Sequence, residues 1–354
     1  MNAASKEGRD IVIRSPNWIG DCIMALPAIR ALKDHLPQTD IYLAAKQHLC
    51  DIYKNIEEIK EIIPIPGENS LKAILKASGK LRTYGFQRGI LFTNSFSSAF
   101  LFKLAGIGKL IGYSKDLRGF LLDKKIPFPR DNKHHIYFYL DLAEAFLKEE
   151  TGKKIDRDYS NEPVITNDEW EKVSAFFLEI GIDLGVPLVG ISSSAAYGSA
   201  KEWLPERFGE LIQRILQEKP AARVLLFGSS KEKEKISRIL EFVEVENRGN
   251  AYNLAGRLSL RETIVAISLC NLFISNDSGL MHVASSLDLP LIALFGPTKP
   301  HKTAPLNKNA RTIHYPVDCA PCNHRECPLD HRCMNAIPVD EVFDALVPLL
   351  PQNG

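Results

Sequence analysis

Asp277, Ser278 and Gly279 stand where a strand-like run, LFISN, passes directly into an apolar helical pattern. The free N–H groups and the positive dipole end of such a helix start attract anions, phosphate above all. Gly279 removes the Cβ that would block a close ligand. His282 follows Ser278 by four residues and so lies on the same helix face. The segment therefore predicts a phosphate-binding site.

A helix cap is the competing interpretation, because Asp is a good residue with which to begin a helix. Capping by Asp277 would leave the glycine and the histidine unexplained. It would also leave unexplained a second turn, in which Gly296 and Thr298 flank a proline after the next strand-like run. We therefore favour phosphate binding and include Gly296 and Thr298 in the predicted site.

Asp21 ends the loop SPNWIGD, which joins the first strand-like run to the first helical one. A carboxylate at the carboxyl end of a first strand can act as a general base if it reaches the proton to be removed. Asp21 could equally be an N-cap, with Gly20 as an ordinary turn residue. The spacing alone leaves these two interpretations even.

Lys201 lies in a third loop, SSSAAYGSAKEWLP, shortly before a helical pattern. A cation at that place opposes the helix dipole, so it is a poor choice for capping. Beside a diphosphate it would neutralise the charge that builds up on a leaving group. A solvated lysine at a loop tip is the alternative, and the two other loops make it less attractive.

The elements that must position these loops follow from the rest of the pattern. Short β-branched runs alternate with amphipathic stretches, which is typical of parallel strands joined by crossover helices. Because ligands bind at the carboxyl ends of such strands, the three loops should lie at binding edges. The expected strands are residues 11–14, 41–45, 62–65, 89–92, 187–191, 224–227, 272–275 and 291–295, and the expected helices are 22–36, 136–148, 206–217 and 278–286.

A polar stretch without periodicity, KKIDRDYSNEP at 153–163, separates two halves of the chain. The length of 354 residues also suits about two domains. We expect an α/β fold of two facing Rossmann-like domains, residues 1–160 and 161–354, with a cleft between them. Whether the final helix crosses back to the first domain stays open.

Composition excludes several classes of protein. The 44 Lys and Arg residues against 43 Asp and Glu leave a formal net charge of +1, unlike a general nucleic-acid binder. No apolar run approaches the ~20 residues of a membrane-spanning helix. The first residues lack the apolar stretch of a signal peptide. The expectation is a soluble cytoplasmic protein with no nucleic-acid partner.

Basic residues nevertheless gather in the first half. Residues 72–88 hold five Lys or Arg and no acidic residue, and residues 109–133 hold seven basic side chains against three acidic ones. Such stretches can meet an anionic surface. A solvated charged face is the commoner explanation of any single run.

Four of the seven cysteines crowd into one short segment, namely Cys319, Cys322, Cys327 and Cys333. Their spacing has a metal-like character, because the first pair is CxxC and two histidines lie nearby. A structural zinc, reduced thiols and oxidised pairs all stay open, and no catalytic role is expected. The other three cysteines stand singly in apolar surroundings and are expected to be buried.

The chain resembles glycosyltransferase family 9, the ADP-heptose:lipopolysaccharide heptosyltransferases. The matching segments run in order over nearly the whole chain: SPNWIGD, LFTNSFSSAF, AAYGSAKEWLPERF, VLLFGSSKEKE, YNLAGRLSL and NDSGLMHVASSLDLPLIALFGPT. The resemblance implies a GT-B fold and an inverting transfer from ADP-L-glycero-D-manno-heptose to the inner core of lipopolysaccharide (heptosyl-Kdo-lipid A). It implies no obligatory metal or cofactor, and it places the acceptor mainly in the first domain, at the inner face of the cytoplasmic membrane.

By the same resemblance Asp21 corresponds to the catalytic base and Lys201 to the lysine that contacts the donor diphosphate. Glu232 falls near an acidic residue that contacts the donor ribose. The donor-binding motif is matched by Asp277, Ser278, Gly279 and His282. One departure bears on these contacts: Glu202 stands where the family often has Arg, which puts a negative charge beside Lys201.

The acceptor is expected at Asn17 and Trp18 of the first loop and at Lys72 and Arg118 of the basic stretches. Three alternatives remain. The protein could be an isomerase like the nonhydrolysing sugar-nucleotide 2-epimerases, or a nucleotide-binding protein that has lost catalysis. It could also be a family 9 transferase with another donor sugar or with the acceptor of the first heptose.

Overall fold

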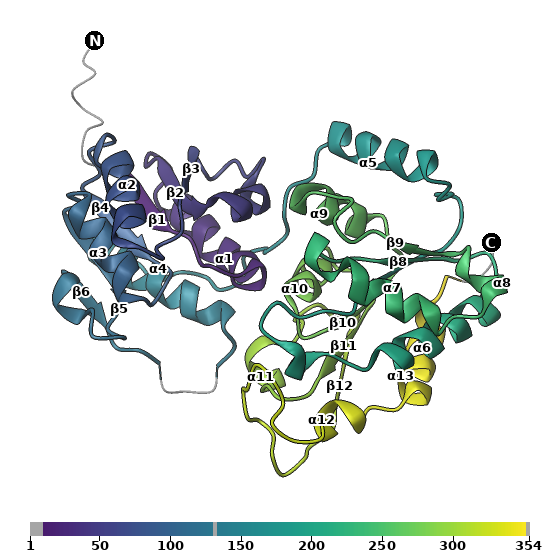
Figure 1. Ribbon diagram of the computed structural model, residues 1–354. Coiled ribbons are helices and arrows are strands. Elements are labelled where there is room, and N and C mark those ends of the chain that lie inside the picture. Colours follow the sequence, from purple (N-terminus) through teal and green to yellow (C-terminus); the bar gives the residue numbers. More distant parts are fainter. Residues whose placement is uncertain (1–9, 130–132, 352–354) are drawn as a thin grey trace. The chain divides into compact units, whose positions relative to one another are not determined.

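The computed structural model describes residues 10–129 and 133–351, and the chain divides into two units, Met1–Val164 and Ile165–Gly354. The first unit is built on one sheet in the order β3-β2-β1-β4-β5-β6, with every pair of neighbours parallel (Figure 1). The central strands are buried apolar runs, as expected for a parallel sheet covered on both faces. The strands are β1 (Ile11–Arg14), β2 (Ile41–Lys46), β3 (Glu61–Ile65), β4 (Arg88–Leu91), β5 (Lys109–Tyr113) and β6 (Lys124–Ile126).

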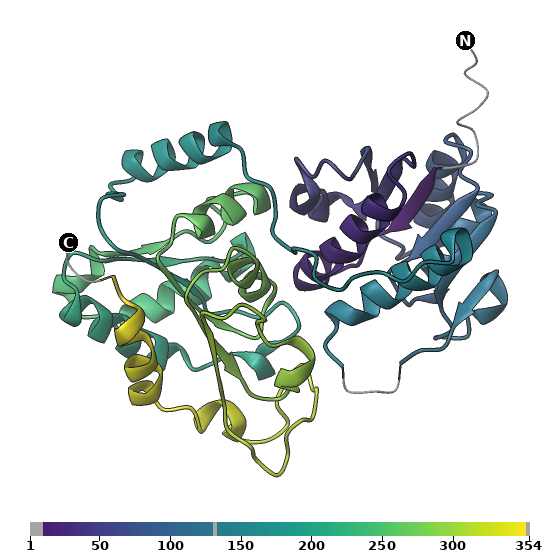
Figure 2. The same ribbon diagram turned by 180° about the vertical axis from the view of Figure 1, so that it is seen from behind.

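Helices cover both faces of this first sheet. Helix α1 (Ile19–His35) packs with α4 (Ile136–Thr151), and α2 (Leu71–Arg82) packs with α3 (Phe96–Leu104). Figure 2 shows α1, in purple, and α4, in teal, over the same face. The other face forms a core in which Val12 and Ala44 of the sheet meet Leu81 and Phe102 of the second helix pair.

The second unit repeats the arrangement, in the order β12-β11-β10-β7-β8-β9. Counted from the first strand of each unit, the two sheets have the same order of strands. Gly190 in β7 is required by packing, because a Cβ there would lie 2.4 Å from the Phe273 ring of β10. The strands are β7 (Leu188–Ser192), β8 (Arg223–Leu226), β9 (Ala251–Asn253), β10 (Leu272–Asn276), β11 (Leu291–Phe295) and β12 (Ala310–His314).

The helices of the second unit also form two layers. One core joins the sheet to α6 (Pro205–Glu218), α7 (Lys233–Glu241), α12 (Arg332–Asn335) and α13 (Val339–Leu346). Helix α9 (Leu260–Ser268) packs with α5 (Asn167–Glu179) and α10 (Gly279–Ser286). The remaining short helices are α8 (Val245–Arg248) and α11 (Pro300–Thr303). The last helix, α13, packs against α6 within this unit.

The expected α/β class with parallel sheets is confirmed, and each strand predicted from the sequence is present to within one residue at either end. Three helix starts differ from the prediction: α1 begins at Ile19 rather than 22, α6 begins at Pro205 rather than 206, and α10 begins at Gly279 after a capping serine. The strands β5, β6, β9 and β12 were not predicted, because they are short or broken by polar residues and glycine. Among the described residues, no helix is long and apolar enough to cross a membrane.

Candidate active site

All three loops singled out in the sequence lie where a sheet reverses its strand order. The reversal falls between β1 and β4 in the first sheet and between β7 and β10 in the second. In open α/β sheets the carboxyl ends of such strands are the usual ligand-binding positions. The loop with Asp21 follows β1, the loop with Lys201 follows β7, and Asp277 directly follows β10.

In the second unit the carboxylate of Asp277, which follows β10, connects the loop after β7 with the loop after β11. Its Oδ2 accepts hydrogen bonds from Lys201 Nζ at 2.6 Å and from Thr298 Oγ1 at 2.7 Å. The Asp277 and Lys201 side chains are only 5% and 13% exposed. Ser278 is the N-cap of α10, its Oγ accepting from Met281 N at 3.3 Å. The capping interpretation of Asp277 is therefore wrong, because its side chain is bonded to Lys201 and Thr298 instead.

Serine hydroxyls surround the start of α10. Ser278 Oγ lies 2.9 Å from Ser275 Oγ and 3.4 Å from Ser192 Oγ. Ser193 and Ser194, which follow β7, are 2% and 5% exposed, and their hydroxyls have no hydrogen-bond partner within the described part of the chain. A buried hydroxyl without a partner costs free energy. The arrangement therefore offers hydrogen bonds to a polar ligand at the positive end of α10.

The structure places the other expected donor-binding residues in the second unit, and it gives two of them, Gly296 and Glu232, structural contacts of their own. His282 is 8% exposed on α10, and Gly279 is the first residue of that helix. A Cβ on Gly296 would lie 2.3 Å from Met334 Sδ, so packing against α12 accounts for this glycine. Glu232 Oε2 accepts hydrogen bonds from Ser229 N and Ser229 Oγ, both at 2.7 Å, in a capping box. Their roles toward a donor stay predictions.

Glu202, whose charge adjoins Lys201 in the sequence, does not pair with that lysine. Its Oε1 accepts from Ala195 N at 3.2 Å, and its Oε2 pairs with Lys235. Lys201 Nζ instead lies 4.9 Å from the centroid of the Tyr197 ring. The departure at Glu202 therefore leaves the pairing of Lys201 with Asp277 intact.

In the first unit, Asp21 occupies the first turn of α1, whose N-cap is Trp18. The N-cap interpretation of Asp21 is therefore wrong. Helix α4 supplies Tyr139, a buried side chain whose ring lies 5.3 Å from that of Phe92. Burial, the charge of Asp21 and a hydrogen bond with that carboxylate raise the pKa of Tyr139 well above its usual value. A protonated phenol thus lies against the expected base.

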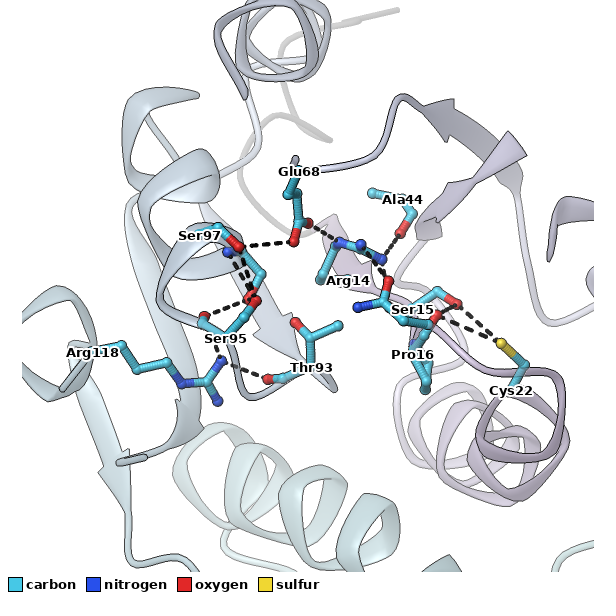
Figure 3. A network of polar contacts seen from close by, with 12 residues as sticks. Arg14, Ser15, Pro16, Cys22, Ala44, Glu68, Thr93, Ser95, Ser97 and Arg118 are labelled. Carbon is cyan, nitrogen blue, oxygen red and sulfur yellow. Dashed lines mark hydrogen bonds and ion pairs between the residues drawn. The ribbon is translucent and has the colours of Figure 1, made fainter. Parts of the chain in front are cut away.

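The ends of β1 and β4 hold a buried polar network that the sequence analysis missed (Figure 3). Arg14 is fully buried, and its Nε donates to Glu68 Oε1 at 2.7 Å. The same guanidinium donates to Asn17 Oδ1 at 2.9 Å, and Glu68 Oε2 accepts from Ser97 Oγ at 3.2 Å. The signal for Arg14 was its charge at the end of the otherwise apolar run IVIR.

Arg118, expected at the acceptor, is fully buried in the first unit. Its guanidinium donates to the backbone oxygens of Tyr113 at 2.9 Å and Thr93 at 2.5 Å, and to Asn94 Oδ1 at 3.2 Å. Burial lowers the pKa of Arg118 to about 10, which leaves it charged at neutral pH. Through these hydrogen bonds Arg118 connects the end of β5 with the loop after β4 and stabilises both.

The other expected acceptor residues are open to solvent to different degrees. Trp18 is 44% exposed, and Lys72 is exposed on α2. Asn17 is half-buried, with its Oδ1 bound to Arg14. The four acceptor candidates therefore do not form one group of surface residues, because Arg118 is enclosed by backbone carbonyls.

The cysteine segment does not fit a zinc centre in this structure. All four thiols are free, and across residues 10–129 and 133–351 no three His, Cys, Asp or Glu side chains are grouped so that they could hold a metal ion. Cys333 is buried on α12, whereas the other three are half-buried on the preceding loop. Burial, with the neighbouring thiols, raises the pKa of Cys333.

The two parallel sheets have the same strand order, and each carries a polar loop where that order reverses. These features define a protein with two Rossmann-like domains, of the GT-B class. The crystal structure of the Escherichia coli ADP-heptose lipopolysaccharide heptosyltransferase II matches with a TM-score of 0.82 at 26% identity, over 96% of this chain and 98% of that one. A family 9 glycosyltransferase from Veillonella parvula shares the fold, with a TM-score of 0.82 at 20% identity over 98% and 99% of the chains. The expected fold class is confirmed.

This chain belongs to glycosyltransferase family 9 (heptosyltransferase), whose sequence model matches residues 74–332. Among its relatives are lipopolysaccharide heptosyltransferase 2 of Salmonella typhimurium and of Escherichia coli. Each is 31% identical over 86% of this chain and 87% of the relative. The expectation of a family 9 transferase is confirmed.

Proposed function

We propose that this chain is an inverting heptosyltransferase that moves a heptose from ADP-heptose to the inner core of lipopolysaccharide. The observation that carries the proposal is the network of Lys201, Asp277 and Thr298 beside unpartnered buried serines. It combines a cation, a helix start and free hydroxyls, which together suit a diphosphate leaving group. The relatives named lipopolysaccharide heptosyltransferase 2 suggest the sugar and the acceptor.

The proposed reaction is a single displacement. The acceptor hydroxyl attacks the anomeric carbon, a new glycosidic bond forms, and the bond to the ADP oxygen breaks on the opposite side. Asp21 takes the proton of the hydroxyl, and Tyr139 holds the Asp21 carboxylate by a hydrogen bond. Lys201 and the start of α10 neutralise the departing diphosphate. No covalent sugar–enzyme intermediate forms.

A membrane surface is the proposed place of the reaction, at the cytoplasmic side, because the acceptor carries a lipid. Helix α2 presents Leu71 and Leu75, 62% and 52% exposed, next to the exposed Lys72 and Lys76. Apolar side chains beside lysines suit the interface of an anionic bilayer. The ring centroid of Phe120, which is 73% exposed, lies 6.0 Å from that of Phe96 at the start of α3. These two side chains are further exposed apolar groups on the first unit.

The isomerase alternative is not favoured, because the family and the relatives are named as transferases. Incubation of the enzyme with ADP-heptose alone distinguishes it, since an isomerase would alter the donor without any acceptor. Another donor nucleotide is tested by comparing the thermal shifts given by ADP, UDP and GDP. Zinc at the cysteine segment is kept apart from the proposal and is tested by elemental analysis.

The central experiment measures heptose transfer to inner-core acceptors that carry no heptose or one heptose. Transfer to the acceptor with one heptose is the expected result. The variant Asp21→Ala should lose transfer while it still binds ADP, because Asp21 serves only the acceptor proton. Unchanged turnover in that variant would overturn the assigned base.

A further inference from the structure

The segment between β12 and α12 lies against the loop that carries Lys201 (Figure 1). Ala200 N donates to Arg325 O at 3.0 Å, and the Tyr197 hydroxyl donates to Asn323 O at 2.6 Å. His331 Nε2 lies 2.9 Å from Ala200 O. Two loops that are far apart in the sequence are therefore fixed to each other next to Lys201.

Gly198 makes this close approach possible. A Cβ at that position would lie 2.1 Å from Arg325 O, far inside any allowed contact. The backbone of Arg325 can therefore lie on the loop only because residue 198 has no side chain. The position of Arg325 is thus set by its main chain, independently of where its guanidinium points.

The Tyr197 ring has two cations beside it. Lys201 Nζ lies 4.9 Å and Arg325 Cζ 5.6 Å from its centroid. Lys201 has Asp277 as a carboxylate partner at 2.6 Å. Arg325 is exposed, and no acidic side chain in the described ranges forms an ion pair with it, whereas Arg332 nearby pairs with Asp330 at 2.9 Å. Of the two cations beside the Tyr197 ring, Lys201 has a carboxylate partner, and within the described ranges the charge of Arg325 is not paired.

We propose that Arg325 is a second donor-binding cation, placed by Tyr197 to bind the diphosphate of the nucleotide sugar together with Lys201. This inference rests on the proposed function of the same site. A diphosphate carries more than one negative charge, so a single paired lysine would leave part of that charge unmatched. The planar guanidinium donates two parallel hydrogen bonds to phosphate oxygens, a geometry that a lysine cannot offer. Tyr197 is the positioning residue, since its ring holds the guanidinium by a cation–π contact.

The test is calorimetric titration of the whole protein with ADP, for the wild type, Arg325→Gln, Arg325→Lys and Arg332→Gln. Arg325→Gln should weaken ADP binding about 10-fold, because one charge-assisted contact is lost. Arg325→Lys should recover part of the affinity, and Arg332→Gln should bind like the wild type. Arg332 is the matched control because it lies just beyond the same segment and has its own acidic partner. Circular dichroism of each variant confirms that it is folded.

The outcomes separate this inference from the proposed function. A wild type that does not bind ADP would overturn the proposed function. A wild type that binds ADP, with Arg325→Gln binding equally well, would overturn the role of Arg325 alone. Equal losses in Arg325→Gln and Arg332→Gln would also overturn it, since they would reflect the charge of the segment.

Discussion

Lys201 and Asp277 form a nearly buried ion pair at 2.6 Å although 76 residues separate them in the chain. Lys201 follows β7 and Asp277 follows β10, so the pair joins the two strands at which the second sheet reverses. A buried pair adds little net stability, but the loss of one partner leaves the other charge uncompensated. The pair therefore keeps Lys201 in place before any donor is bound.

Removal of the lysine alone should cost stability as well as activity. In Lys201→Met the buried Asp277 carboxylate keeps, among the residues that the structure describes, only Thr298 as a side-chain partner, so the free energy of unfolding should fall by about 3 kcal/mol. The double variant Lys201→Met/Asp277→Asn should recover most of that stability, because no charge is left buried. Transfer from ADP-heptose should fall about 100-fold in both variants. Urea unfolding and transfer assays check this, and transfer that recovers together with stability would contradict it.

Tyr139→Phe should change the pH dependence of transfer. The ring contact with Phe92 is kept, and the hydrogen bond that stabilises the ionised Asp21 carboxylate is lost. The acidic limb of the kcat profile should therefore move to higher pH, so that activity falls more at pH 6 than at pH 8. Tyr113→Phe is the control, since its hydroxyl donates to the Phe138 carbonyl at 2.8 Å. Equal losses at both pH values would show that Tyr139 has only a packing role.

Arg118→Lys should destabilise the first unit. A lysine cannot reach the carbonyls of Tyr113 and Thr93 and the Asn94 side chain at once, so buried acceptors are left unpaired. The free energy of unfolding should fall by about 2–3 kcal/mol. Lys72→Gln, an exposed change on α2, should stay within about 0.5 kcal/mol of the wild type. Chemical denaturation measures both, and a stable Arg118→Lys with a raised KM for the acceptor would return Arg118 to the acceptor site.

Glu169 should make stability dependent on acid pH. Hydrogen bonds from Arg261, at 2.7 and 2.6 Å, are the largest cause that lowers the pKa of Glu169 to about 2. A depressed pKa in the folded state adds stability above the unfolded value near 4.5, and that stability is lost as the pH falls toward 2. Glu169→Gln should therefore be less stable at pH 7 by about 1 kcal/mol, since solvent screens the pair. The difference should narrow at pH 4 and shrink further at pH 3, and a difference independent of pH would contradict the assignment.

Five of the seven thiols should react in two groups. Cys22 and Cys270 are buried, and burial raises the pKa of both, to about 12 for Cys22. Cys319, Cys322 and Cys327 are half-buried on a loop. A thiol reagent at pH 8 should modify these three in the native protein and the buried pair only after unfolding. Mass spectrometry of modified peptides locates the sites. Protection of the three loop thiols in the native protein would contradict this grouping and favour the metal centre.

The strands could be predicted from the sequence because parallel strands buried on both faces are continuous apolar runs. IVIR and LIALF need no knowledge of their neighbours to be recognised. Edge strands such as KKI and AYN have no such run, and only their pairing with β5 and β8 makes them strands. Local sequence carries little of that long-range information.

The candidate site was predictable in its loops but not in its contacts. The glycine and polar residues after β10 indicated an anion site. The partner of Asp277 is Lys201, which lies in the loop after another strand, β7, and no local sequence pattern indicates this pairing. Arg118 was expected at the acceptor because it lies in a basic stretch, and the structure buries it among carbonyls. Charge counts along a chain carry no information on which side chains point inward.

The division into two continuous units also bears on how the protein is made. Every strand of the first sheet lies before residue 127, and its last covering helix ends at Thr151. All the pairing partners of that sheet therefore leave the ribosome before the second sheet begins at Leu188. Parallel sheets fold slowly, because each pair of strands closes a long loop. During synthesis the first unit can complete this slow step alone, before the strands of the second sheet are available to mispair with it.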